Sequence, residues 1–401
     1  MTARLPPAAA PAAPAAWGGV LALSLGAFVL VASEFMPVSL LTPIAADLRI
    51  SEGQAGQAIA VSGAFALITS LAIASLAGRL DRKMLLAALT LLMIVSGTVA
   101  AFAPDYPTFM LGRALIGVAI GGFWSMSAAT AIRLVPPEGV PKALAIVNGG
   151  NALATVVAAP LGSFLGALIG WRGAFFCLIP IAAIALAWKL ASLPRMPAAR
   201  ERTGSGMFAL LKRPAVVFGM VGCALLFMGQ FALFTYLRPF LETVTQAGPG
   251  LLSLLLLVIG IAGFVGTTLI GTLLRDSLYR TLVAIPLLLA AVALGLIACG
   301  TSVPATALLL GLWGLLATSA PVGWWTWVAR TLPGDAEAAG GLLVAIVQLA
   351  IAGGATLGGL LFDGYGYRAT FGASAAILVA GASMAWLAAR AARPADTAPL
   401  A

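Results

Sequence analysis

The sequence consists largely of apolar runs, each about as long as a helix that crosses a lipid bilayer. Such a helix needs about 20 mostly apolar residues, and breaks rich in charge, proline or glycine separate twelve runs of this kind. They are Trp17–Leu41, Ala55–Ala77, Met84–Ala103, Thr108–Ile132, Ala143–Ile169, Ala174–Leu190, Ala215–Leu241, Leu251–Leu274, Leu282–Gly300, Thr306–Val328, Gly341–Phe362 and Ala369–Ala389. We therefore expect an all-α integral membrane protein with twelve transmembrane helices.

The composition supports lipid as the main solvent. Only 9% of the residues are charged and 61% are hydrophobic, whereas a soluble chain is roughly 25% charged. The chain has no histidine, which argues against histidine-ligated zinc and against serine or cysteine catalysis of the triad type. Three cysteines lie inside apolar runs and are expected to be small buried hydrophobes. We expect no enzyme activity, no metal and no cofactor, so that acid–base work falls to carboxylates.

The basic residues indicate topology and do not indicate nucleic-acid binding. The net charge is +9, but the basic residues lie in short connectors and are not clustered on one soluble face. An excess of Lys and Arg marks cytoplasmic loops. With the N-terminus in the cytoplasm, only Arg49, Arg172, Arg238 and Arg368 fall on the other side, and only Arg113 lies well inside a span. We expect both termini and the central linker to face the cytoplasm.

The chain divides into two similar halves. We expect a disordered tail at residues 1–16, a six-helix half at 17–191, a cytoplasmic linker at 192–213, a second half at 214–390 and a tail at 391–401. The segment Gly170–Phe175 recurs 196 residues later as Gly366–Phe371, and we pair Pro37 with Pro239 as breaks in the first span of each half. Two repeated halves around a site near the bilayer midplane are typical of secondary transporters.

One acidic residue lies deep inside a span. Glu34 lies roughly 10 Å below the outer end of the first span, and Arg113 lies about as deep in the fourth. A charge at that depth costs several kcal/mol unless it is paired or faces water. We predict an ion pair or a shared polar cavity, with Glu34 as the proton carrier. A permanent salt bridge that fixes helix packing is the alternative.

Amides and aromatic side chains inside the spans form the candidate substrate site. Stacking rings and hydrogen-bonding amides suit a flat solute with polar edges, although interhelical hydrogen bonds would use the same amides. The candidates are Trp124, Asn151, Gln230, Phe231, Tyr236 and Gln348. Asn151 and Gln348 occupy nearly equivalent places in the two halves.

Several motifs resemble those of the major facilitator superfamily, in its drug:proton antiporter-1 group. The loop Gly78-Arg79-Leu80-Asp81-Arg82-Lys83 is similar to the cytoplasmic signature, although the usual Gly-Arg pair after Asp-Arg is absent. The stretch from Ala159 to Gly166 resembles the fifth-helix antiporter motif. The resemblance implies the major facilitator fold, with two pseudo-symmetric six-helix halves, and gating roles for Gly78, Asp81, Arg82, Pro160 and Gly162.

Within that group, the stretch from Glu34 to Pro43 and Gly229-Gln230-Phe231-Ala232 resemble the bacterial purine ribonucleoside exporters. The resemblance implies a proton-coupled antiporter that exports inosine- or guanosine-like solutes by alternating access. We expect a monomer with a small-molecule substrate and the lipid bilayer as its partners. A broader drug or sugar exporter on the same fold is one alternative, and a membrane protein that transports nothing is another.

Overall fold

The computed structural model of the chain describes residues 16–77, 80–197, 210, 212–332 and 336–392, and every regular element in them is a helix. The first half contains α1 (Trp17–Ser39), α2 (Leu41–Leu48), α3 (Glu52–Ala77), α4 (Arg82–Ala101), α5 (Tyr106–Arg133), the short η1 (Pro137–Gly139) and α6 (Val140–Ser192). The second half contains α7 (Pro214–Phe234), α8 (Leu237–Thr243), α9 (Pro249–Cys299), α10 (Val303–Thr331) and α11 (Ala336–Ala391).

Three of these helices are too long to cross a bilayer once. At 1.5 Å per residue, a helix of about 20 residues spans the hydrocarbon core, whereas α6, α9 and α11 have 53, 51 and 56 residues. Each bends at one residue with non-helical dihedral angles, which are Gly170, Ser277 and Gly366 respectively. Counting each bent helix as two spans gives twelve in the described part of the chain and confirms the expected number.

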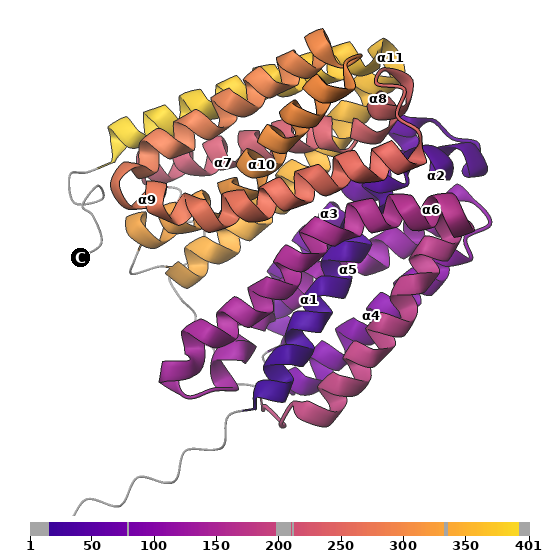
Figure 1. Ribbon diagram of the computed structural model, residues 1–401. Coiled ribbons are helices and arrows are strands. Elements are labelled where there is room, and N and C mark those ends of the chain that lie inside the picture. The colour runs from indigo at the N-terminus through magenta and orange to yellow at the C-terminus, as the bar shows by residue number, and fades with distance from the viewer. Residues whose placement is uncertain (1–15, 78–79, 198–209, 211, 333–335, 393–401) are drawn as a thin grey trace, which may run out of the picture.

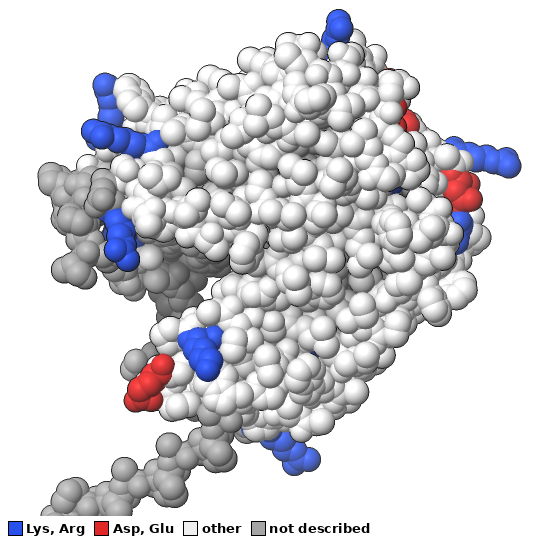
Figure 2. Space-filling model, in the orientation of Figure 1, with Lys and Arg blue, Asp and Glu red and all other residues white. Residues whose placement is uncertain are grey.

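The two halves form two bundles that lie against each other (Figure 1). They touch mainly where α3 packs against α11 and where α6 packs against α9. In Figure 1 the halves meet at the end that carries α2 and α8, and they diverge toward the end where α1 begins. Figure 2 shows the molecular surface hollowed between the halves at that second end, while charged side chains gather at the two ends and leave the visible surface between them largely uncharged. This distribution is the one expected of a protein that spans a membrane.

The repeat recognised in the sequence is visible in the backbone. A short helix follows a break in the first span of each half, α2 after Leu40 and α8 after Tyr236. Gly170 and Gly366, 196 residues apart, share φ angles of 76° and 77°. At these two positions the positive φ requires glycine, because other residues rarely adopt it.

The predicted pairing of Pro37 with Pro239 is wrong. Pro37 lies inside α1, before the break, whereas Pro239 lies inside α8, after the break. The residue equivalent to Pro239 is Pro43, since each is the third residue of its short helix. The spacing of 196 residues that relates the two bends also relates Pro43 to Pro239.

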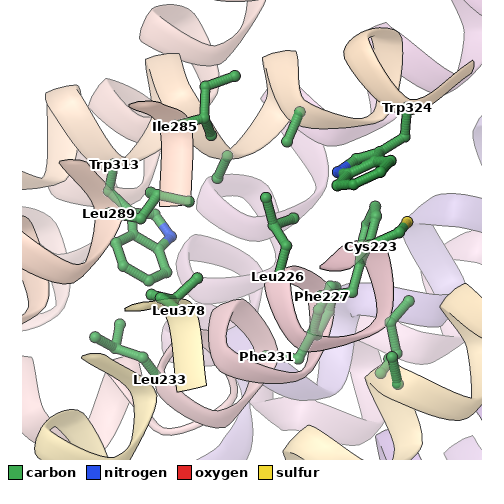
Figure 3. Packing of buried hydrophobic residues seen from close by; sticks show 14 of the residues in the cluster. Cys223, Leu226, Phe227, Phe231, Leu233, Ile285, Leu289, Trp313, Trp324 and Leu378 are labelled. Carbon is green, nitrogen blue, oxygen red and sulfur yellow. The ribbon is translucent and has the colours of Figure 1, made fainter. Parts of the chain in front are cut away.

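The core of the second half is built from aromatic and branched side chains on α7, α9, α10 and α11. Figure 3 shows Cys223, Leu226 and Phe227 of α7 below the ring of Trp324, with Leu378 nearby. Cys223 is fully buried in this cluster, as expected for a small hydrophobe. By contrast, Cys177 is partly exposed and Cys299 is exposed on the apolar surface.

Candidate functional site

Arg113 is completely enclosed in the first half, with an exposed fraction of 1%. Its guanidinium donates to three backbone carbonyl oxygens, those of Ser33 and Glu34 on α1, at 2.8 and 2.9 Å, and that of Ala58 on α3, at 3.1 Å. A fourth bond reaches the hydroxyl of Ser62 at 3.3 Å. Arginine suits such a site because it has five N–H donors in a fixed geometry. Arg113 therefore joins α1, α3 and α5.

The predicted ion pair between the Arg113 guanidinium and the Glu34 carboxylate needs correction. In the described part of the chain, the guanidinium bonds the backbone oxygen of Glu34 and makes no hydrogen bond to its carboxylate. The positive charge still acts on the carboxylate through space. The sequence placed the two residues at matched depth, but depth alone could not show that backbone carbonyls would take up the donors of Arg113.

The Glu34 side chain lies where the two halves meet. Glu34 is 6% exposed, and its carboxyl has the side-chain amide of Gln348, on α11, as a hydrogen-bonding neighbour. Gln348 is itself 7% exposed. The carboxyl from one half therefore faces an amide from the other half. A change in how α1 and α11 approach each other must change the environment of this acid.

Phe35 and Phe231 stack across the same boundary, with ring centroids 5.7 Å apart. Phe35 follows Glu34 on α1, and Phe231 follows Gln230 on α7, so that the two pairs occupy equivalent positions 196 residues apart. Among the residues that the structure describes, the buried Oε1 atom of Gln230 has no hydrogen-bond partner. An unpaired buried amide oxygen is costly, and this one is available to a solute that donates a hydrogen bond.

Trp124 and Asn151 are both half-buried in the first half. The Trp124 ring makes an edge contact with Phe123, with centroids 5.5 Å apart. The backbone oxygen of Asn151 accepts a bond from Thr155, and Gly150, next to it, lies directly against the backbone of Ser24 on α1. The structure thus places Asn151 at the contact between α1 and α6.

Tyr236 lies elsewhere, in the region where the halves are closed. Its hydroxyl donates to the carbonyl oxygen of Ala355 at 2.7 Å and lies 3.5 Å from that of Gly53. Its ring stacks on Phe362 with a centroid distance of 5.3 Å. Tyr236 is fully buried, so in this conformation its polar atom is used between helices and does not face an open site.

The closed end is held by further bonds between the halves. Asp363, at the end of the eleventh span, accepts bonds from the hydroxyl of Ser51 at 2.5 Å and from the backbone N–H of Gly53 at 2.9 Å. These two residues flank the start of α3, where N–H groups lack partners within the helix and negative charge is favourable. Gln57 accepts from Thr356 at 3.1 Å. Asp363 is thus a helix cap that one half provides to the other.

The motif residues Pro160 and Gly162 lie in α6 against the end of α1. Both are buried, and a Cβ atom on Gly162 would lie 2.6 Å from the hydroxyl oxygen of Ser39 and 3.5 Å from Met36. The approach is therefore close enough to require glycine. Any movement of the end of α1 must involve this contact.

Part of the cytoplasmic loop motif, from Leu80 to Lys83, lies within the described residues. Asp81 caps α4 by accepting bonds from the N–H groups of Lys83 at 2.8 Å and Met84 at 3.4 Å. It also accepts from the N–H of Met196 at 2.9 Å, and the N–H of Arg82 donates to the Met196 carbonyl at 3.0 Å. Gly78 lies outside the described residues. Asp81 and Arg82 therefore bind the segment after α6 to the start of α4.

Lys189 is a functional candidate that sequence reasoning missed. The sequence places Lys189 among the basic residues of the cytoplasmic side, but its side chain has no exposed surface. It stands one turn before the end of α6, at Ser192, a position from which a lysine ordinarily reaches water. No feature of the sequence shows that its side chain turns inward, although the small residue Gly26 provides the space.

A twelve-span protein with two repeated halves, a buried acid at their boundary and one closed end is a secondary transporter by its architecture. The sequence profile of the Major Facilitator Superfamily matches residues 23–338. The chain belongs to this superfamily, and it is a transporter and not an enzyme.

Individual relatives are similar over almost the whole chain. The chain is 63% identical over 383 residues to a Pseudomonas aeruginosa protein named transcription regulatory protein OpdE, covering 94% of this chain and 95% of that one. It is 41% identical over 363 residues to the purine ribonucleoside efflux pump NepI of Salmonella paratyphi B, covering 90% and 91%.

Solved structures share the fold at low sequence identity. A bacterial homolog of the human lysosomal transporter Spinster, in an inward-facing and occupied conformation, gives a TM-score of 0.77 at 16% identity over 95% of this chain and 98% of that one. The D-xylose-proton symporter gives 0.75 at 15% identity, covering 96% and 99%.

Proposed function

We propose that this transporter exports purine ribonucleosides in exchange for protons. The observation that carries the proposal is the Glu34 carboxyl, which lies buried at the boundary of the halves beside Gln348 and without a hydrogen bond from Arg113. The similarity to NepI over nine-tenths of the chain supports the substrate class. The proton is the coupling ion, and no cofactor is required.

The similarity to an efflux pump supports export as the direction, and the closed end fits a state that is ready to load a solute from the cytoplasm. The basic residues predict that α2 and α8 lie on the outer side of the inner membrane, so the hollow between the halves opens to the cytoplasm. A solute then enters from the cytoplasm. Opening the outer end requires Asp363 to leave Ser51 and Gly53, and it requires the α3–α11 contact to separate.

Coupling follows from the cost of burying charge. An ionised Glu34 is tolerable while water or a solute reaches the boundary, but its burial with an amide and no directly bonded cation is costly. A proton taken up from outside removes that cost and allows the halves to close around the acid. Loss of the proton to the cytoplasm then prepares the site for the next solute.

The driving force is adequate for export. One charge that crosses 100 mV supplies about 2.3 kcal/mol, and this corresponds to a concentration ratio of roughly fifty-fold, since 1.4 kcal/mol is a factor of ten. A single proton per solute is therefore sufficient for useful accumulation outside the cell.

A purine matches the groups at the boundary. The stacked rings of Phe35 and Phe231 provide a flat apolar surface that a base could enter or replace. The unpaired oxygen of Gln230 can accept a bond from a base N–H, and Gln348, beside Glu34, provides a further amide. Sugars lack a flat ring, so this arrangement favours nucleosides over the sugar alternative.

The test is uptake of radiolabelled inosine into inverted membrane vesicles energised by respiration. We expect accumulation that a protonophore abolishes and that unlabelled guanosine, but not arabinose or an amphipathic cationic drug, competes away. Equal competition by unrelated drugs would favour the broad exporter. Uptake that is insensitive to the protonophore would contradict proton coupling.

A regulatory role is a second candidate, favoured by the 63% identity to a protein named a transcription regulatory protein. An exporter can influence gene expression by changing the cytoplasmic concentration of an inducing solute. If regulation acts through transport, the Glu34→Gln variant loses both activities together. A variant that moves no solute and still regulates would separate the two functions.

A further inference from the structure

The side chain of Lys189 points into the first half instead of toward water. Its amine nitrogen donates to the hydroxyl oxygen of Thr90 on α4 at 2.7 Å and lies 5.1 Å from the centre of the Phe123 ring on α5. The Thr90 hydroxyl donates in turn to the carbonyl of Leu86, so that Thr90 can only accept from the amine. The amine therefore has one hydrogen-bond acceptor and one ring face.

Space for the amine is provided on α1. A Cβ atom on Gly26 would overlap the Lys189 amine nitrogen and would lie 2.9 Å from the carbon that carries it. Gly26 is buried inside a regular helix, where alanine is normally the better residue. The glycine thus accommodates the amine, and the amine lies against the same helix that carries Glu34.

No carboxylate is among the described contacts of this amine. On α1 the nearest acid is Glu34, eight residues after Gly26 and so about 12 Å along the helix. On α4 the charged residues are Arg82 and Lys83, at its beginning, directly after the capping residue Asp81. On α5, Arg113 lies ten residues before Phe123 and Arg133 lies ten residues after it. On α6 itself the described charged residues are Lys142 and Arg172, far along the chain.

An ammonium ion has three N–H groups and needs a counter-charge or water when it lies in a membrane. The described contacts of Lys189 include no counter-charge, and its side chain has no exposed surface. The charged form therefore becomes favourable only when α1, α4 and α6 separate enough to admit water. The movement of α1 that exposes or buries Glu34 also moves Gly26, so both groups change their surroundings in the same step.

We propose that the Lys189 amine is a second proton-binding site of the transporter. It lies on the cytoplasmic side of Glu34, and helix α1, which carries Glu34, also contacts the amine. The amine gains a proton from water to become an ammonium ion when the first half hydrates, and it returns that proton to water when α1 closes on it. This inference rests on the proposed proton coupling and adds a second participating group.

The first test measures the proton state of Lys189 directly and needs no transport. The chain has four lysines, Lys83, Lys142, Lys189 and Lys212, so a lysine-labelled sample in nanodiscs gives a simple NMR spectrum. The signal lost in Lys189→Met belongs to this residue, and in the full-length protein we expect it to change between its ammonium and amine positions within the pH range of transport. A signal that keeps one state over that range would overturn the proposal.

The second test measures protons released when inosine binds to the purified protein. We expect Lys189→Met to lower the release by about half, Glu34→Gln to leave a remainder, and the double variant to abolish it. Complete loss in Glu34→Gln alone, with full release in a folded Lys189→Met, would overturn the role of Lys189 while leaving the proposed function intact. If the wild type binds inosine and releases no proton, the proposed coupling fails. The NMR result then decides by itself whether Lys189 binds and releases a proton.

Two further variants separate proton binding from packing. Gly26→Ala keeps the lysine and displaces its amine, whereas Gly149→Ala adds a methyl group where nothing lies within 4 Å. We expect the first to shift the Lys189 signal and the proton release, and the second to change neither. Equal effects of the two would show that Lys189 serves packing only, and would contradict the proposal.

Discussion

The guanidinium of Arg113 donates a hydrogen bond to the backbone oxygen of Glu34, with 2.9 Å between Nη2 and that oxygen, and leaves the Glu34 carboxylate without a direct bond from it. The ion pair predicted from the sequence gave Arg113 and Glu34 one shared role, whereas this contact assigns them two different roles. Arg113 holds the fold of the first half, whereas the acid remains free to respond to the other half. Each role can be tested alone.

We predict that Arg113→Gln destabilises the protein while Glu34→Gln does not. The shorter amide cannot reach the carbonyls of Ser33, Glu34 and Ala58 together, and each buried group that loses its partner costs about 1–3 kcal/mol. Thermal unfolding in detergent, followed by size-exclusion chromatography, measures the difference. Equal melting temperatures for Arg113→Gln and the wild type would show that these bonds contribute little.

We predict that Asp363→Asn opens the outer end. Hydrogen bonds to an ionised acceptor contribute about 1.5–3 kcal/mol, so weakening this cap should raise the outward-open population by roughly tenfold. Spin labels on cysteines introduced at the exposed positions Ala46 and Tyr365, in a background without native cysteines, report the distance between the halves.

Asp105→Asn is the matched control for Asp363. Asp105 caps α5 by accepting from the Thr108 N–H at 2.9 Å, within one half. Hydrogen bonds from the side chain and the backbone N–H of Thr108 lower the pKa of its carboxyl. Its replacement should reduce stability without altering the distance between the labels. A distance distribution unchanged by Asp363→Asn would mean that the cap does not hold the gate.

We predict that Gly170→Ala and Gly366→Ala each destabilise the fold by about 1–3 kcal/mol, the usual cost of a strained backbone. Their φ angles are 76° and 77°, and no neighbouring atom lies within 4 Å of an added Cβ. The cost must therefore come from the backbone alone. Melting curves compared with Gly149→Ala, a helical glycine with the same free space, test this. A matching melting temperature for all three variants would exclude backbone strain.

We predict an acid-sensitive contribution from Asp47, outside the spans. A hydrogen bond from Arg172 lowers the pKa of this carboxyl below its usual 3.8, and Trp171 donates a second bond at 3.1 Å. Because the folded-state pKa is depressed, the contribution is present above pH 4 and disappears as the pH falls through the folded value. Both partners are more than a third exposed, so the stabilisation is at most about 1 kcal/mol.

The corresponding measurement compares melting temperatures of the wild type and Asp47→Asn at pH 7 and at pH 3. The wild type should be slightly more stable at pH 7, and the difference should shrink at pH 3. A difference that is constant between these two values would show that ionisation of Asp47 does not contribute.

Much of the fold could be predicted from the sequence because lipid imposes a strong rule. Every span must be an apolar helix of about 20 residues, so apolar runs gave the number and approximate limits of the helices. The bends at Gly170 and Gly366 also coincide with the repeated motif. The breaks at Leu40 and Tyr236 could not be located in this way, since each lies inside one of the apolar runs predicted as a single span.

The sequence predicted which residues of the site are buried, but it did not predict which atoms they bond. Burial of Glu34 and Arg113 followed from their positions in apolar runs, but the bonds of Arg113 to backbone oxygens depend on how three helices meet. The same reason explains Lys189, which stands near a helix end and turns inward only because Gly26 leaves room. Equivalent residues 196 apart, such as Glu34 and Gln230, could have been found from the repeat alone.

The most direct test of proton coupling compares Glu34→Gln with the wild type in proteoliposomes that carry a proton gradient. We predict that the variant still exchanges labelled inosine for unlabelled inosine. Its gradient-driven accumulation should be at least about tenfold lower than that of the wild type, because one charge crossing 100 mV can supply a ratio of roughly fifty-fold. Glu138→Gln, which removes an exposed acid in η1, should behave like the wild type. Full gradient-driven accumulation by Glu34→Gln would contradict the role of this acid as the proton carrier.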